Sequence, residues 1–218
     1  MRRRTAIALI LSLPGSLAMA QSLQPLLAAA QRGDALEVER LLAGGATVDG
    51  RDGQGRTALL LATHGNHVAA ARALIRAGAD VNAKDQIQDS PYLYAGAEGR
   101  LEILRLTLAA GADLRSTNRY GGTALIPAAH HGHVDVVREM LATKVDIDHV
   151  NRLGWTALLE AIILGDGGPA HTEIVRLLVE AGADVNLPDR DKVTPLAHAE
   201  RRGQSTIIEI LKAKNARR

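Results

Sequence analysis

The residues best suited to chemistry are the histidines of His130-His-Gly-His133, because imidazole is the commonest metal ligand in proteins. A helical site of two histidines needs a spacing of four residues, so that both rings lie on one face. His130 and His131 are adjacent and would point in different directions on a helix. His64 lies far away in the chain. We therefore predict no metal site and no cofactor, and keep His130 and His131 as candidate partner-binding residues.

Motifs for catalysis are equally lacking in the sequence. There is no Cys to act as a nucleophile, and neither the hydrolase elbow G-x-S-x-G nor the phosphate-binding loop G-x-x-x-x-G-K-[ST] occurs. Most acidic residues fall in Gly-Ala-Asp turns or on solvated helix faces. The sequence therefore predicts a protein that is not an enzyme.

The composition is that of a folded chain with an unusual core. Of the 218 residues, 46% are hydrophobic and 23% are charged, but only 2% are aromatic and none is Phe. Large aromatic side chains usually dominate compact cores. This core must instead be built from Ala, Leu, Val and Ile, which favours thin helices that stack closely.

The first twenty residues have the three parts of a secretory signal. Arg2–Arg4 form a positive end, residues 6–13 are a short apolar run, and Ala18-Met-Ala20 is a small-residue cleavage pattern. We expect cleavage after Ala20 and a periplasmic location; the alternative is an ordinary buried N-terminal helix. No Cys follows the run and no later segment is long enough to span a bilayer, so we expect no membrane anchor.

Loss of this segment also changes the charge balance. The net charge of +2 includes its three arginines, so 23 of the 26 basic residues remain against 24 acidic ones. A nearly neutral chain argues against binding to nucleic acid or to an anionic membrane surface.

A six-residue motif recurs along the chain at a fixed spacing. Its steps are 33, 33, 33 and 38 residues. A second motif, Gly-Ala-Asp, keeps the same period at Gly78, Gly111 and Gly182. The copies of the first motif are Thr57-Ala-Leu-Leu-Leu-Ala62, Ser90-Pro-Tyr-Leu-Tyr-Ala95, Thr123-Ala-Leu-Ile-Pro-Ala128, Thr156-Ala-Leu-Leu-Glu-Ala161 and Thr194-Pro-Leu-Ala-His-Ala199.

This pattern resembles the ankyrin repeat, whose period is 33 and whose signature is T-P-L-H-x-A. The resemblance implies an all-α solenoid of paired antiparallel helices joined by short β-hairpin fingers. The chain departs from the signature where its His is replaced by Leu, Ile or Ala. We divide the chain into a signal peptide, residues 1–20, and one ankyrin-repeat domain, residues 21–218. The expected repeats are 21–52, 53–85, 86–118, 119–151, 152–189 and 190–218.

Helix signals agree with this division. Thr or Ser at the start of each motif is a good N-cap, and a left-handed Gly is expected to end each first helix at Gly99, Gly132, Gly165 and Gly203, with Asn66 in the same role. The stretches before each motif, such as Asp52-Gly-Gln-Gly55, contain turn residues and predict the protruding fingers.

Three irregularities interrupt the pattern. Pro127 is expected to remove one backbone hydrogen bond from a first helix. Lys144 replaces a helix-ending Gly, at a cost of roughly 1 kcal/mol if it is left-handed. Five extra residues, 166–170, separate the helices of the fifth repeat; they are either part of a binding face or a tolerated loop.

The fingers and the ends of the first helices are the positions left free for binding. Trp, Tyr and Arg dominate protein interfaces, and several lie on neighbouring fingers. Tyr92 and Tyr94 instead fall at core positions of a first helix and are predicted to be structural. The candidate partner-binding residues are Arg119, Tyr120, Arg152, Leu153, Trp155, His130 and His131.

The function expected from this pattern is rigid display of a binding surface on the fingers and concave face. We predict a monomeric adaptor, chaperone or inhibitor of another periplasmic protein. Resemblance to small exported bacterial ankyrin proteins implies one alternative, a helper of an antioxidant enzyme such as a catalase, handling metal or haem through its histidines. A secreted effector that binds a host protein is the other alternative.

Overall fold

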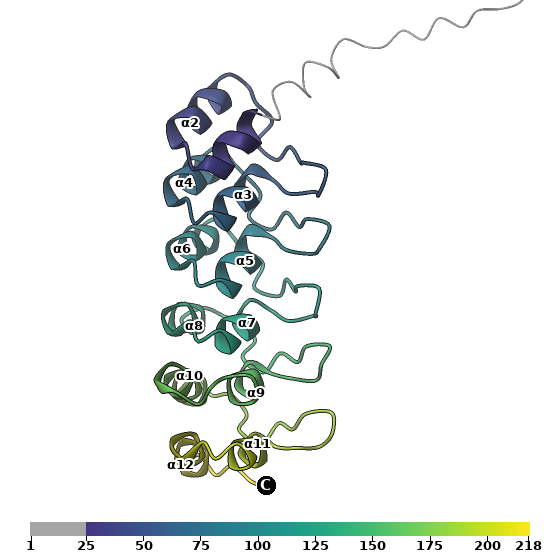
Figure 1. Ribbon diagram of the computed structural model, residues 1–218, viewed down its shortest axis with the longest axis vertical. Helices are drawn as coiled ribbons and strands as arrows, with labels where there is room; N and C mark the ends of the chain where they lie inside the picture. Colours follow the sequence, from purple (N-terminus) through teal and green to yellow (C-terminus); the bar gives the residue numbers. More distant parts are fainter. Residues whose placement is uncertain (1–24) are drawn as a thin grey trace, which may run out of the picture.

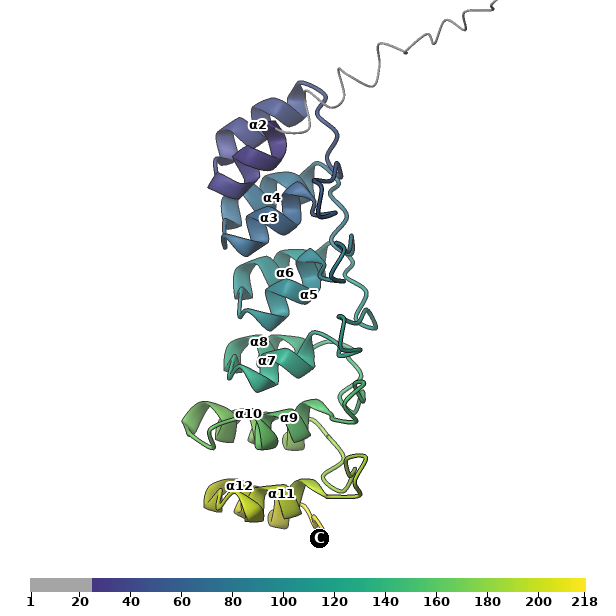
Figure 2. The ribbon, with the colours of Figure 1, turned by 45° about the vertical axis from the view of Figure 1, so that its right-hand side comes forward.

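The computed structural model describes residues 25–218, which form two parallel layers of short helices with a row of loops along one side (Figure 1). The predicted signal peptide and its cleavage site lie outside the described residues. The first helix of each repeat belongs to one layer and the second helix to the other, and the pairs stack along the long axis (Figure 2). No helix in residues 25–218 is both long and apolar enough to cross a bilayer.

Each layer contains one helix from every repeat. The first helices are residues 25–32, α3 (Ala58–His64), α5 (Pro91–Ala97), α7 (Leu125–His130), α9 (Ala157–Ile163) and α11 (Pro195–Arg201). The second helices are α2 (Ala35–Ala43), α4 (Val68–Arg76), α6 (Leu101–Ala109), α8 (Val134–Leu141), α10 (Pro169–Glu180) and α12 (Ser205–Ala213).

The N-cap signals of the sequence set where the first helices begin. The side-chain oxygens of Thr57, Ser90, Thr156 and Thr194 each accept a hydrogen bond, at 3.2–3.3 Å, from the backbone N–H three residues later. These bonds satisfy N–H groups that have no partner within the helix. The predicted caps are confirmed in these four repeats.

The fourth repeat differs because of Pro127. In the other motifs the residue at this position donates its N–H to the carbonyl of the capping residue, but Pro has no N–H. Ile126 donates to the Thr123 carbonyl instead, at 3.2 Å, and α7 begins one residue later than its counterparts. The Thr123 hydroxyl is buried without a partner. The predicted loss of a backbone bond is confirmed.

One backbone prediction was wrong. Gly165 is not left-handed; Gly167, inside the five-residue insertion, takes that conformation with φ of 71°. Lys144 is not left-handed either, so the expected cost does not arise. The Thr143 hydroxyl ends α8 instead, because it donates to the Met140 carbonyl at 2.6 Å and accepts from the Val145 N–H at 3.3 Å.

The fingers are the five loops 52–56, 85–89, 118–122, 151–155 and 189–193, and each is closed by one Asp or Asn. Its side-chain Oδ1 accepts hydrogen bonds from the backbone N–H groups two and four residues later, at 2.9–3.1 Å. The fingers are therefore hairpin-shaped, as predicted. Within residues 25–218 the only β-bridge joins Arg51 and Thr57, so the fingers are turns and not ladders.

Small residues allow neighbouring repeats to approach closely. A methyl group added at Gly96 in α5 would lie only 2.8 Å from the Ala124 Cβ of the next repeat. The core consists of Ala, Leu, Val and Ile, with Tyr92 the largest fully buried side chain. The scarcity of bulky aromatics thus reflects the short distance between neighbouring repeats.

Replacing Gly96 with Ala is expected to lower the free energy of unfolding by about 1–3 kcal/mol, because the new methyl group overlaps the neighbouring repeat. Gly53→Ala is the matched control, since a Cβ there meets nothing within 4 Å. Urea unfolding of both variants checks this. A Gly96→Ala protein as stable as the control would contradict the close approach of α5 and α7.

Candidate functional site

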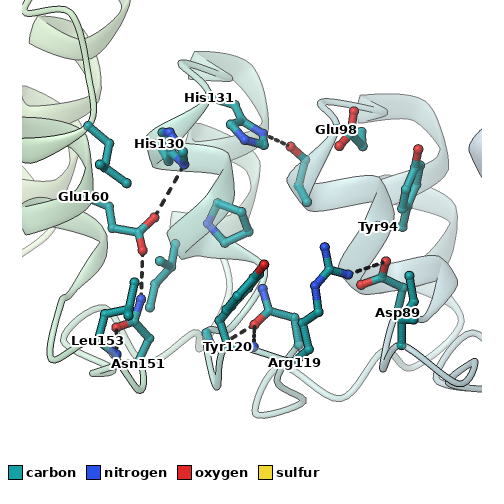
Figure 3. A pocket seen from close by; sticks show the side chains of 17 residues that line it. Asp89, Tyr94, Glu98, Arg119, Tyr120, His130, His131, Asn151, Leu153 and Glu160 are labelled. Carbon is teal, nitrogen blue, oxygen red and sulfur yellow. Dashed lines mark hydrogen bonds and ion pairs between the residues drawn. The ribbon is translucent and has the colours of Figure 1, made fainter.

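A groove of about 570 Å³ lies between the fingers and the first-helix ends of the third, fourth and fifth repeats. Its walls come from α5, α7 and α9 and from the fingers 85–89, 118–122 and 151–155 (Figure 3). Of the six large hydrophobic side chains that are exposed in residues 25–218, four line this groove: Ile87, Tyr120, Leu153 and Leu164. Clustered exposed apolar side chains are typical of binding surfaces, whereas scattered ones are ordinary.

The structure brings five of the predicted site residues together in this groove. Arg119, Tyr120 and Leu153 reach it from the fingers, and His130 and His131 from the end of α7. Arg119 lies over the Tyr120 ring, with its guanidinium carbon 5.0 Å from the ring centroid, and is 3.6 Å from the Asp89 carboxylate. Arg119 therefore contacts both the Tyr120 ring and the Asp89 carboxylate on the adjacent finger.

Arg152 and Trp155 do not line the groove. The Arg152 guanidinium donates to the Arg119 carbonyl at 3.0 Å, so this side chain joins two fingers. Trp155 is half-buried, and its backbone N–H is held by Asn151. The five inserted residues are also absent from the groove lining; Asp166 instead accepts from Gly168 at 2.8 Å at the start of α10.

The histidines mostly connect neighbouring repeats. His67 and His171 bind the backbone carbonyls of Gln31 and His130 through Nε2, at 3.1 and 2.8 Å. His131 binds the Ala97 carbonyl at 2.7 Å through Nδ1. In residues 25–218 no three side chains of a type that binds metal are grouped around one point.

The sequence did not predict several residues of the groove, and three of these bear on its chemistry. Tyr94 was assigned to the core, but it is half-buried, lines the groove and packs on His64 with ring centroids 4.2 Å apart. Glu160 and Asn151 were not singled out at all. The sequence did contain a signal for Glu160, because it is the only acid at the fifth position of the motif. The other copies have Leu61, Tyr94, Pro127 and His198 there.

Glu160 is a buried acid on α9, with only 6% of its surface exposed. Its Oε1 accepts a hydrogen bond from Asn151 Nδ2 at 2.8 Å, and its Oε2 is 3.8 Å from His130 Nδ1. Burial raises the pKa of the Glu160 carboxyl above its usual 4.5, although the bond from Asn151 offsets part of this effect. Burial also raises the pKa of Asp89 and lowers the pKa of His130.

Comparisons with known proteins agree with this helical repeat fold. The family described as "Ankyrin repeats (3 copies)" matches residues 5–85 and 92–189. An ankyrin repeat domain from Acinetobacter baumannii AYE is 57% identical, with a TM-score of 0.86 over 88% of this chain and 98% of that one. The ankyrin repeat protein EF0377 is 44% identical, with a TM-score of 0.84 over 87% of this chain and 97% of its own.

One curated relative matches a shorter segment. The putative ankyrin repeat protein YahD of Escherichia coli (strain K12) is 46% identical over 57 residues, which is 26% of this chain and 28% of YahD. The match thus spans little more than a quarter of that relative.

The fold defines a helical repeat solenoid, and the groove spans three of its repeats. The chain belongs to the ankyrin repeat family. Repeats of this family are generally non-catalytic scaffolds for protein–protein interaction.

Replacing Glu160 with Gln is expected to raise the melting temperature at pH 7. The charged form is disfavoured by burial, so the wild type loses stability as the pH rises from 4.5 through the raised pKa of Glu160. Gln keeps an oxygen for Asn151 and carries no charge. The difference in melting temperature should therefore shrink as the pH falls toward 4.5.

Thermal unfolding between pH 4 and pH 8 measures this difference. Asp89 and His130 are present in both proteins, so their own contributions to the pH dependence largely cancel in the comparison. A difference that does not change with pH would show that the Glu160 charge has no part in it.

Proposed function

We propose that this protein is a non-catalytic adaptor of the bacterial envelope that holds a partner protein in the groove. The observation that carries the proposal is the concentration of four exposed apolar side chains, with Arg119, along three adjacent fingers and helix ends. Tyr and Arg in such clusters are the residue types that contribute most to protein–protein affinity.

Rigidity supports the same function. Every finger that borders the groove is closed by the same pair of side-chain hydrogen bonds. The fingers are also joined to each other, since the Arg152 N–H donates to the Tyr120 carbonyl at 2.9 Å. A surface that is ordered before binding loses little conformational entropy when the partner docks. We propose that the adaptor acts as a monomer, since the proposed groove needs residues from one chain alone.

The envelope assignment rests on the first twenty residues, whose positive end, apolar run and small-residue cleavage pattern are those of a secretory signal. The partner is accordingly a periplasmic protein. The function involves no catalytic step and no cofactor.

The groove is tested by a pull-down from envelope extract with the wild type and a Tyr120→Ala, Leu153→Ala double variant. Truncation of two central side chains should weaken partner capture by tenfold or more, at roughly 1–2 kcal/mol for each residue. Leu36→Ala is the matched control, because Leu36 is 80% exposed but lies on α2, outside the groove. Equal capture by all three proteins would place the contact elsewhere.

The location is tested by cell fractionation and intact-mass measurement of the native protein. The expected result is a periplasmic protein that begins at Gln21. A cytoplasmic protein that retains residues 1–20 would contradict the envelope assignment and leave the groove proposal intact.

A further inference from the structure

The groove contains an acid, Glu160, at the fifth position of the six-residue motif. No other copy of the motif has a charge without a nearby partner at this position. Glu160 occupies the position filled by Leu61, Tyr94 and Pro127 in the three preceding repeats. His198 fills it in the last repeat, where it is 2.7 Å from the Asp189 carboxylate and so has a partner of opposite character.

Glu160 has no such partner. Asn151, which donates to Oε1, is neutral, and His130 Nδ1 is 3.8 Å from Oε2, beyond hydrogen-bonding distance. Burial, together with the nearby His131 and His171, lowers the pKa of His130 and so disfavours its charged form. Among the described residues, no Lys or Arg lies within ion-pair distance of Glu160. A carboxylate this buried is unfavourable until a positive charge approaches it.

The rest of the groove has the same sign of charge. Asp89, Glu98 and Glu160 are acidic, and Arg119, which contacts Asp89, is the only Lys or Arg in the lining. Apolar side chains lie beside the acid: Ile126 and Pro127 on α7, Leu153 on the finger and Leu164 at the end of α9. The surface thus combines a desolvated negative charge with an adjoining aliphatic wall (Figure 3).

We infer that the groove receives a segment of the partner protein in which a Lys or Arg side chain pairs with Glu160 while a neighbouring aliphatic side chain packs against Leu153 and Leu164. This inference rests on the proposed function and specifies the chemistry of its partner. Charge complementarity decides the occupant, because an incoming ammonium or guanidinium group compensates Glu160 without displacing Asn151. An acidic segment would instead meet a lining with three acids and one basic residue, Arg119, which already contacts Asp89.

The test is selection of a displayed library of random twelve-residue peptides on the purified chain, in parallel with Glu160→Gln and Glu180→Gln. Glu180 is an exposed acid at the end of α10, outside the groove, and provides a control of the same residue type. Peptides selected on the wild type and on Glu180→Gln should be enriched in Lys or Arg next to an aliphatic residue. Peptides selected on Glu160→Gln should lose this enrichment.

A double-mutant cycle then shows whether the basic residue contacts Glu160. Replacing that residue with norleucine in the best peptide, or Glu160 with Gln in the protein, should each weaken binding about tenfold or more. The two changes together should weaken binding little further, because the second partner is already unpaired. Thermal unfolding confirms that both protein variants are folded.

Three outcomes overturn the inference: a selected pool without basic enrichment, an empty pool, or basic peptides that bind Glu160→Gln as tightly as the wild type. The Tyr120→Ala, Leu153→Ala variant separates this failure from failure of the adaptor function. Peptides that depend on Tyr120 and Leu153 but not on Glu160 refute the charge pairing alone. Peptides that depend on none of the three also refute the groove as the docking surface.

Discussion

The arrangement of the binding surface depends on one side-chain oxygen in each finger. The Oδ1 atom of an Asp or Asn accepts two backbone N–H groups, which fixes a five-residue turn without a β-ladder. Because the same bond pattern recurs in all five fingers, successive fingers have nearly the same shape and stack in a row (Figure 1). Residues at equivalent finger positions, such as Ile87, Tyr120 and Leu153, are thereby brought onto one surface.

The choice between Asp and Asn at that position also affects the chemistry of the groove. Both residues can close the turn, but only Asn has a second group that donates hydrogen bonds. Asn151 uses its oxygen for the turn and its Nδ2 for Glu160, so a single residue shapes the finger and holds the buried acid. Asp189 uses its second oxygen for His198 instead. The same scaffold position thus supports either an acid or a histidine in the neighbouring helix.

The irregular fourth repeat lies at the centre of this surface. Pro127 removes a backbone bond from α7 and leaves the Thr123 hydroxyl buried without a partner, yet its ring lines the groove beside Ile126. A neighbouring repeat on each side compensates for such a defect, because each repeat shares its core with the next. A residue that weakens one helix is therefore tolerated where it contributes an apolar surface to the groove.

The sequence by itself determined the repeat, the helix pairs, four of the five N-caps and the turns of the fingers, because these depend on local signals that recur at fixed spacing. It also identified five of the residues that line the groove, since finger and helix-end positions follow from the period. It misjudged Gly165, because the five-residue insertion changed how that helix ends.

Only the tertiary structure decided which free positions share one groove. Tyr94 fell in a core column but lies half-exposed at the edge of its layer, whereas Trp155 and Arg152 lie on a finger but outside the groove. The role of Glu160 depends on Asn151, nine residues away, and on His130 of the preceding repeat. The repeat period gives each residue its position in the motif. The burial and charge state of its side chain depend on contacts between repeats, which the spacing alone does not specify.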